Sequence, residues 1–134
     1  MANVADDLEL PDDPASIDGA ADLPYDESAA GLVRRGIQVI ERRYSDSDLT
    51  IARVASEAGA SREHFSRRFR ARMGCSPLEH LHEVRIQNAQ RLLTNSSLSI
   101  YEIGFECGYK RNSEFSAWFR RLRGSTPTGT RRGS

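Results

Sequence analysis

The sequence repeats itself once, and this duplication restricts the chain to folds built from two copies of one short supersecondary unit. Residues 49–59 (LTIARVASEAG) align with residues 98–108 (LSIYEIGFECG) at a shift of 49 residues. Later residues of the first copy recur at a shift of 50, namely Phe65, Phe69, Gly74 and Pro77 as Phe115, Phe119, Gly124 and Pro127. Two copies are too few for a solenoid, which needs three or more stacked repeats.

Each copy has the pattern of two helices joined by a tight turn. A hydroxyl side chain, Thr50 or Ser99, opens the first helix as its N-cap, and Ser99 with Glu102 has the spacing of a capping box. Gly59 or Gly108 then ends that helix in the left-handed conformation, which costs glycine little. The second helix carries two phenylalanines four residues apart. This is the helix-turn-helix pattern, and a plain helical hairpin without a ligand is the alternative.

A long helix over 77–93 is predicted between the two copies. Ser76, Pro77 and Glu79 form a strong start, because they supply an N-cap, a proline at the first helical position and a capping-box carboxylate. Seventeen residues would span roughly 25 Å, so flanking recognition helices could reach successive major-groove faces about 34 Å apart. A further helix from about Ala29 to Tyr44 precedes the first copy, because apolar residues recur there at helical spacing.

The charges are divided unevenly along the chain, although they sum to zero. Residues 1–28 contain nine acids and no basic residue, whereas residues 29–134 carry ten acids and all 19 basic residues, a net charge of +9. The acidic segment is too polar to offset the entropy lost on ordering, so we predict a disordered tail over 1–28 and a folded domain over 29–134. A basic domain favours a polyanionic partner, and its many arginines suit contacts to phosphate and guanine.

The composition argues against several other classes of protein. No stretch approaches the ~18 apolar residues of a membrane span, and no signal-peptide pattern opens the chain. We therefore expect a cytoplasmic protein that does not associate with a membrane. Cys75 and Cys107 are too few for a disulfide framework. His80 and His82 would point about 200° apart on a helix and cannot share one metal ion. No phosphate-binding glycine loop or nucleophile motif occurs, and we expect no catalytic site, metal or cofactor.

The ordered set of motifs resembles the DNA-binding domain of the AraC/XylS regulators over about residues 32–127. The matching positions lie in both copies and in the linker between them: Leu49, Thr50, Ile51, Ala55, Gly59, Phe65, Ser66, Arg67, Arg68, Phe69, Arg70, Gly74, Ser76, Pro77, His80, Leu81, Arg85, Ile86, Ala89, Leu92, Leu93, Ser99, Ile100, Glu102, Ile103, Gly104, Gly108, Tyr109, Phe115, Ser116, Phe119, Arg120, Arg121 and Gly124. The resemblance implies an all-α fold, with homeodomain-like helix-turn-helix units at about 32–74 and 98–127 joined by a long linker helix over 77–93. It also implies sequence-specific binding of double-stranded DNA, transcriptional regulation, and a structural role for Arg85 between the two halves.

The second unit departs from the family's pattern at several positions. Arg111 stands where a small polar or acidic residue is usual, so capping of the next helix is expected to pass to Asn112. Ala117 stands where a basic residue is common, and the aromatic residue expected near Gly129 or Thr130 is missing. These differences predict that the second unit reads less DNA sequence than the first.

In the first unit, the residues opposite Phe65 and Phe69 on a helical wheel are predicted to face the major groove. They are Arg62, Glu63, Ser66, Arg67 and Arg70. Arg67 is expected to bind guanine O6 and N7, which is worth ~1–3 kcal/mol of discrimination, and Glu63 to accept from cytosine N4. Ser66 would contact base or phosphate. The alternative is a solvated face of ion pairs such as Glu63–Arg67.

In the second unit, the predicted DNA contacts lie on the corresponding outward face. They are Asn112, Ser113, Glu114, Ser116, Arg120 and Arg121, with Arg123 nearby. Ala117 on this face offers only apolar contact to a thymine methyl group, so the unit is expected mainly to bind phosphates. Trp118 is predicted to pack beside Phe119 rather than to stack on DNA.

A protein-interaction module is the main alternative function. Such a helix-turn-helix domain would regulate another transcription factor or RNA polymerase without binding DNA itself, and it would show no salt-dependent binding to duplex DNA. In the DNA-binding interpretation, RNA polymerase is a further candidate partner. The internal duplication would let a monomer occupy both halves of a DNA site.

Removal of residues 1–28 tests whether the acidic tail competes with DNA. We expect the truncated domain to bind non-specific duplex DNA more tightly at low salt, because nine carboxylates compete with phosphates for the basic residues. Fluorescence anisotropy with a labelled random-sequence duplex measures the change. Equal affinity for the full chain and the truncated domain would reject this competition.

Overall fold

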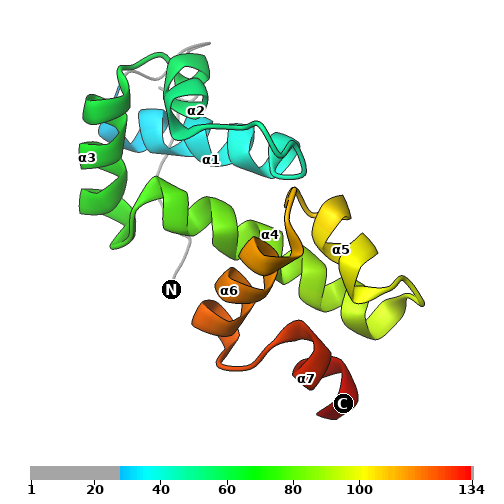
Figure 1. Ribbon diagram of the computed structural model, residues 1–134. Coiled ribbons are helices and arrows are strands. Elements are labelled where there is room, and N and C mark those ends of the chain that lie inside the picture. Colours follow the sequence, from blue (N-terminus) through cyan, green and yellow to red (C-terminus); the bar gives the residue numbers. More distant parts are fainter. Residues whose placement is uncertain (1–27, 134) are drawn as a thin grey trace. The chain divides into compact units, whose positions relative to one another are not determined.

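The computed structural model describes residues 28–133, and these residues form seven α-helices and no strand (Figure 1). The helices are α1 (Ala29–Arg43), α2 (Ile51–Ala58), α3 (Arg62–Met73), α4 (Pro77–Asn95), α5 (Ile100–Glu106), α6 (Asn112–Arg123) and α7 (Pro127–Gly133). The predicted all-α class is confirmed. The acidic tail, apart from Ser28, lies outside the described residues, and the packing given below lies within the unit that begins at Val33.

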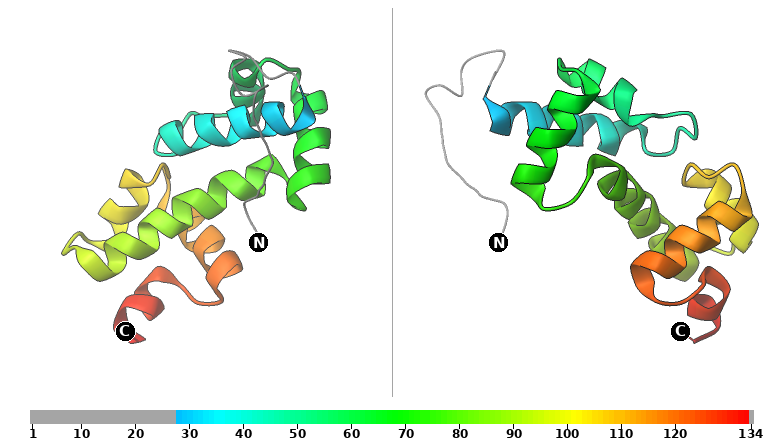
Figure 2. Two further views of the ribbon diagram at one scale, coloured as in Figure 1. Left: turned by 180° about the vertical axis from the view of Figure 1, so that it is seen from behind. Right: turned by 60° about the vertical axis from the view of Figure 1, so that its left-hand side comes forward.

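Helix α4 is the element on which the others are arranged. It contacts α3, α5, α6 and α7. Figures 1 and 2 show this arrangement from three directions. The helix runs to Asn95, beyond the predicted end at Leu93. None of the helices within residues 28–133 combines the length and apolar character needed to cross a membrane.

Side-chain caps fix where most helices begin. A hydroxyl oxygen accepts from the backbone N–H three residues later at the start of α2, α3, α4 and α5, from Thr50, Ser61, Ser76 and Ser99. Ser76 with Glu79 and Ser99 with Glu102 complete the two capping boxes. Helix α6 differs, because Arg111 takes the extended N-cap conformation and its side chain makes no capping hydrogen bond. The prediction that Asn112 caps α6 is wrong, since Asn112 is already the first helical residue.

Two glycines of the second unit permit close approach between elements. A Cβ atom on Gly104 would lie 2.6 Å from Cδ2 of Phe115, so glycine lets α5 pack directly on α6. Gly108 has the predicted positive φ, 102°, but α5 ends two residues earlier and Cys107 is its C-cap. A Cβ atom on Gly108 would lie 2.5 Å from the carbonyl oxygen of Tyr44, so only glycine fits there.

The four phenylalanines of the repeat are fully buried, as a core role requires. Phe65 and Phe69 of α3 pack with ring centroids 5.6 Å apart, and Phe115 and Phe119 of α6 with centroids 6.0 Å apart. The α6 pair joins a core that includes Ile86, Ala89 and Leu93 of α4 and Ile103 of α5. Each unit thus buries one aromatic pair, and this burial fixes which face of α3 and of α6 points outward.

Helix α7 was not expected from the sequence. Two glycines and two threonines among its seven residues give it low intrinsic helix propensity. A tertiary contact supplies the missing stability, because Arg131 donates hydrogen bonds to the carbonyl oxygens of Leu93, Ser96 and Leu98. The guanidinium thereby satisfies carbonyl groups at the end of α4 and in the loop before α5.

Arg85 of α4 holds the linker to the first unit and lies against the second. Its side chain is buried, at 5% exposure, and donates to the carbonyl oxygens of Tyr44 at 2.7 Å and Asp46 at 2.9 Å. Its guanidinium also lies 5.4 Å from the ring centroid of Tyr109, in the turn between α5 and α6. These contacts agree with the structural role that the family resemblance implied.

Arg85→Met is expected to lower the free energy of unfolding by about 2–4 kcal/mol, because two carbonyl groups lose a charged donor inside the protein. Urea denaturation followed by circular dichroism measures the loss. The matched control is Arg91→Met on the same helix, where the arginine is exposed and donates a hydrogen bond to Asn88. That control should stay within about 0.5 kcal/mol of the parent. A similar small loss for both variants would contradict the role given to Arg85.

Candidate nucleic-acid interface

Helix α3 carries the five residues predicted for the first unit. Arg62, Glu63, Arg67 and Arg70 are exposed and Ser66 is half-buried. Glu63, Arg67 and Arg70 lie on the side opposite the buried phenylalanines, whereas Arg62, the first residue of α3, lies one turn before Phe65 on the same side as the two rings. Four of the five line one open depression together with Ala71: Glu63, Ser66, Arg67 and Arg70. These four side chains therefore share one surface, as the helical wheel predicted.

The arginines of α3 are not neutralised by neighbours. The ion pairs among residues 28–133 involve no residue of α3, so the alternative Glu63–Arg67 pair is not formed. The helix carries five arginines and one carboxylate: Arg62, Arg67, Arg68, Arg70 and Arg72, with Glu63. Such a helix presents a row of guanidinium groups to solvent, which suits phosphate oxygens and guanine edges.

Helix α6 also turns its predicted contact residues outward. Asn112, Ser113, Glu114, Arg120 and Arg121 are exposed and Ser116 is half-buried. However, carboxylates of α4 form ion pairs with two of the arginines on this helix. Arg121 lies 3.4 Å from a carboxylate oxygen of Glu79, and Arg123 lies 2.7 Å from one of Glu83 and bonds to Gln90 at 2.9 Å.

The two linker contacts of α6 differ in strength. The Arg121 side chain is 63% exposed. An ion pair so open to water contributes little to stability, and water or another anion readily replaces its partner. Arg123 is 22% exposed and makes bonds to two residues of α4, so it holds α6 in place rather than facing DNA. Arg120 alone among the three arginines takes part in no ion pair within residues 28–133. The second unit therefore offers less free positive charge than the first.

His82 fixes the position of α6 on α4. Its ring stacks on Trp118 at a centroid distance of 3.8 Å and an interplanar angle of 7°, and its Nδ1 lies 2.7 Å from the hydroxyl oxygen of Tyr109. The prediction that Trp118 packs in the protein is confirmed, since it packs against the core cluster that includes Phe119 and also stacks on His82. Burial lowers the pKa of His82 to about 4, and the nearby Arg85 and Arg121 act in the same direction.

His80 and His82 face different units, as the helical wheel required. His80 packs edge-on against Phe69 of α3 with centroids 5.4 Å apart, and burial lowers its pKa as well. Its Nε2 atom is buried and has no hydrogen-bond partner among residues 28–133. The described part of the chain contains no group of three or more His, Cys, Asp or Glu side chains that could hold a metal ion.

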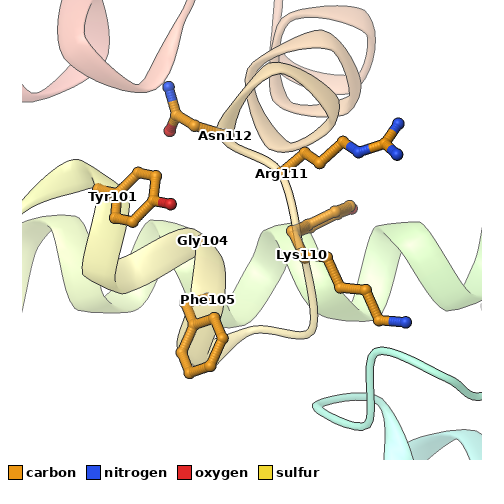
Figure 3. A pocket seen from close by; sticks show the side chains of 7 residues that line it. Tyr101, Gly104, Phe105, Lys110, Arg111 and Asn112 are labelled. Carbon is orange, nitrogen blue, oxygen red and sulfur yellow. The ribbon is translucent and has the colours of Figure 1, made fainter.

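Sequence reasoning missed an aromatic pair on α5. Tyr101 and Phe105 lie one turn apart and are 65% and 68% exposed. With Lys110, Arg111 and Asn112 they line a small cleft beside the start of α6 (Figure 3). Comparison of the two copies would have found them, because small residues occupy the same positions in the first copy.

The buried state of His82 makes stability depend on pH. The unfolded histidine takes up a proton near pH 6.5 and the folded one only near pH 4, so the unfolded state binds more protons between these values. The neutral buried His82 therefore does not reduce the free energy of unfolding above pH 6.5. As the pH drops to 4, this free energy is expected to fall by about 3 kcal/mol. Denaturant titrations at several pH values measure this fall. His82→Phe keeps a ring against Trp118 and should reduce the pH dependence, and an unchanged dependence would contradict the assignment.

The comparisons with known proteins agree on one kind of domain. A family model described as a helix-turn-helix domain matches residues 35–133. The HTH-type transcriptional regulator GlxA of Rhizobium meliloti is 41% identical over 81 residues, which are 60% of this chain and 25% of that protein. The transcriptional activator NphR of Rhodococcus sp is 32% identical over 108 residues, which are 81% of this chain and 31% of that protein. The chain therefore spans less than a third of the length of these relatives.

Solved structures give the same result. The C-terminal domain of AraT, a response regulator from Geobacillus stearothermophilus, has a TM-score of 0.74 and 34% identity, over 77% of this chain and 85% of that one. The DNA-binding domain of AdpA, a global transcriptional factor determined in complex with a target DNA, has a TM-score of 0.70 and 31% identity, over 75% of this chain and 90% of that one.

Proposed function

This chain belongs to the AraC-type helix-turn-helix family, and on that premise we propose that it is a transcriptional regulator that binds double-stranded DNA in a sequence-specific manner. Residues 29–134 are the DNA-binding domain, and residues 1–28 are an acidic tail. Helices α3 and α6 enter successive faces of the major groove as the two recognition helices. Because the two helix-turn-helix units lie in one chain, a monomer suffices to occupy both half-sites.

The observation that carries the proposal is the outward face of α3. Arg67 and Arg70 are exposed there, Arg62 is exposed at the start of the helix, and none of the three belongs to an ion pair within residues 28–133. The aromatic face of the helix is buried. Isolated cations in a row favour a polyanion, because each phosphate they neutralise releases a counterion. The interaction-module alternative has less support, because the family includes a DNA-binding domain determined in complex with a target DNA.

The two units have different tasks in this proposal. In the first, Arg67 binds guanine O6 and N7, Glu63 accepts from cytosine N4, and Ser66 contacts base or phosphate. Arg62 and Arg70 bind flanking phosphates. In the second, the contact residues mainly position the protein on the DNA backbone: Asn112, Ser113, Glu114, Ser116, Arg120 and Arg121. The regulator acts in the cytoplasm without enzymatic activity, and RNA polymerase is its proposed protein partner.

Selection from a random duplex library at about physiological salt tests the function, with the parent chain, Arg67→Ala and the control Arg91→Ala in parallel. We expect two conserved blocks about one helical turn apart for the parent. Arg67→Ala should lose the preference for one G·C pair at a cost of ~1–3 kcal/mol, because only the bidentate guanine contact is removed. Arg91→Ala removes one exposed charge from α4 and should select the parent motif.

Two outcomes would overturn parts of this proposal separately. No enrichment, together with no duplex binding at low salt, would leave the interaction module as the function. A full motif with an unaltered G·C preference in Arg67→Ala would keep the DNA-binding function and reject Arg67 as the base-reading residue.

A further inference from the structure

We propose that the cleft between α5 and the start of α6 binds a phosphodiester of the DNA backbone, with Arg111 and the Tyr101 hydroxyl as the donors; this inference rests on the function proposed above. Tyr101, Phe105, Arg111 and Asn112 line the cleft, and Gly104 lies between the two aromatic residues on α5 (Figure 3). None of the residues that line it carries a carboxylate. The cleft thus combines hydrogen-bond donors, a cation and an apolar wall.

The internal duplication provides a control for the aromatic residues. At the shift of 49 residues, Tyr101 and Phe105 correspond to Ala52 and Ser56 of α2, which are exposed in the same way. The first unit therefore folds with small residues at these positions, and the fold does not require the two rings. Exposed aromatic side chains that are not needed for packing indicate a surface that contacts a partner.

Arg111 supplies an unpaired positive charge to the cleft. It corresponds to Ser61, whose hydroxyl caps α3 at 3.2 Å from the amide nitrogen of His64. Arg111 makes no capping bond and forms no ion pair within residues 28–133. At the corresponding place, the second unit has therefore exchanged a capping hydroxyl for an unpaired cation.

The carboxylates near the cleft are directed elsewhere, and one further cation, Lys110, lines it. Lys110, the next cation, pairs with Asp48 of the loop before α2. Glu102 follows Tyr101 on α5 and accepts from the amide of Ser99 at 2.8 Å. Glu106 follows Phe105, about 100° further around the helix, and is not among the lining residues. The lining thus carries two cations, Arg111 and Lys110, and no carboxylate, so the potential inside the cleft favours an anion.

A phosphodiester of duplex DNA fits this chemistry better than an acidic peptide does. In helix-turn-helix proteins the first helix crosses the DNA backbone while the first residues of the second helix enter the groove. Asn112 is the first residue of α6 and lines the same cleft, so a strand that reaches Asn112 also passes Tyr101. The apolar wall of Phe105 can pack against a deoxyribose, which lies beside every phosphate.

This contact would position the protein on DNA without reading sequence. The second unit needs such a contact, because α4 holds Arg123 and weakly engages Arg121. Arg111 then supplies an unpaired positive charge at the start of α6, whereas Arg121 and Arg123 in the last turn of α6 are paired with carboxylates of α4. The specificity stays with α3, and the second unit adds affinity for any sequence.

The test measures binding of Arg111→Ala and Tyr101→Phe to the selected duplex and to a scrambled duplex at several salt concentrations, with Arg91→Ala as the control. Arg111→Ala should weaken both duplexes about equally, by roughly 5-fold to 10-fold, and should reduce the slope of log K against log salt by about 0.9. Tyr101→Phe should weaken both by about 2-fold to 5-fold and leave the slope unchanged, because it removes a neutral donor. Arg91→Ala should change neither quantity.

Each other result has a defined meaning. If the variants lose affinity for the selected duplex but not for the scrambled one, the cleft contacts bases, and the proposal of a phosphodiester site is wrong. Parent affinity and slope in both variants would overturn the DNA contact, leave the motif intact, and assign the aromatic pair to a protein partner. Failure of the parent to bind any duplex would overturn the proposed function and this inference with it. Thermal melting should be unchanged in both variants, because both side chains are exposed.

Discussion

The buried guanidinium of Arg85 is the interaction on which the geometry of the interface depends. Two backbone carbonyls of the turn after α1 accept its hydrogen bonds, and the ring of Tyr109 lies on its other side. A lysine in its place could not serve both carbonyls with a planar fork of donors. Since α3 and α6 belong to different units, their relation to each other passes through this residue of the linker. A bipartite DNA site of fixed spacing requires that relation to be rigid.

Helix α4 also distributes charge between the two recognition helices. Its carboxylates Glu79 and Glu83 face the end of α6 and engage two of that helix's arginines, whereas none of the ion pairs within residues 28–133 reaches α3. The same linker thus leaves one recognition helix strongly cationic and partly neutralises the other. Copies with the same backbone pattern therefore carry unequal amounts of unpaired positive charge, because of their contacts to the element between them.

Much of the fold could be predicted because its determinants are local or periodic. The hydroxyl caps, the glycine turns and the phenylalanine pairs each act within a few residues. Together with the apolar periodicity of residues 29–44, they locate six of the seven helices within residues 28–133. The outward residues of α3 followed for the same reason, since burial of Phe65 and Phe69 fixes the opposite face.

The remaining features depend on contacts between distant segments, which one sequence does not encode in any short pattern. Helix α7 depends on Arg131 reaching carbonyls more than thirty residues earlier. The stack of His82 on Trp118 and the pairing of Arg123 with Glu83 likewise join α4 to α6. The error at Asn112 had a local cause, because an extended backbone at Arg111 is enough to begin the helix without a side-chain cap.

The duplication separates what the fold requires from what a ligand requires. Positions occupied by equivalent residues in both copies, such as the paired phenylalanines, are buried and serve the core. Positions that differ between the copies at equal exposure are free of that constraint: arginine against alanine at 67 and 117, and serine against arginine at 61 and 111. These substitutions move positive charge from the middle of one recognition helix to the start of the other. A protein that reads bases with one unit and binds the backbone with the other needs this division.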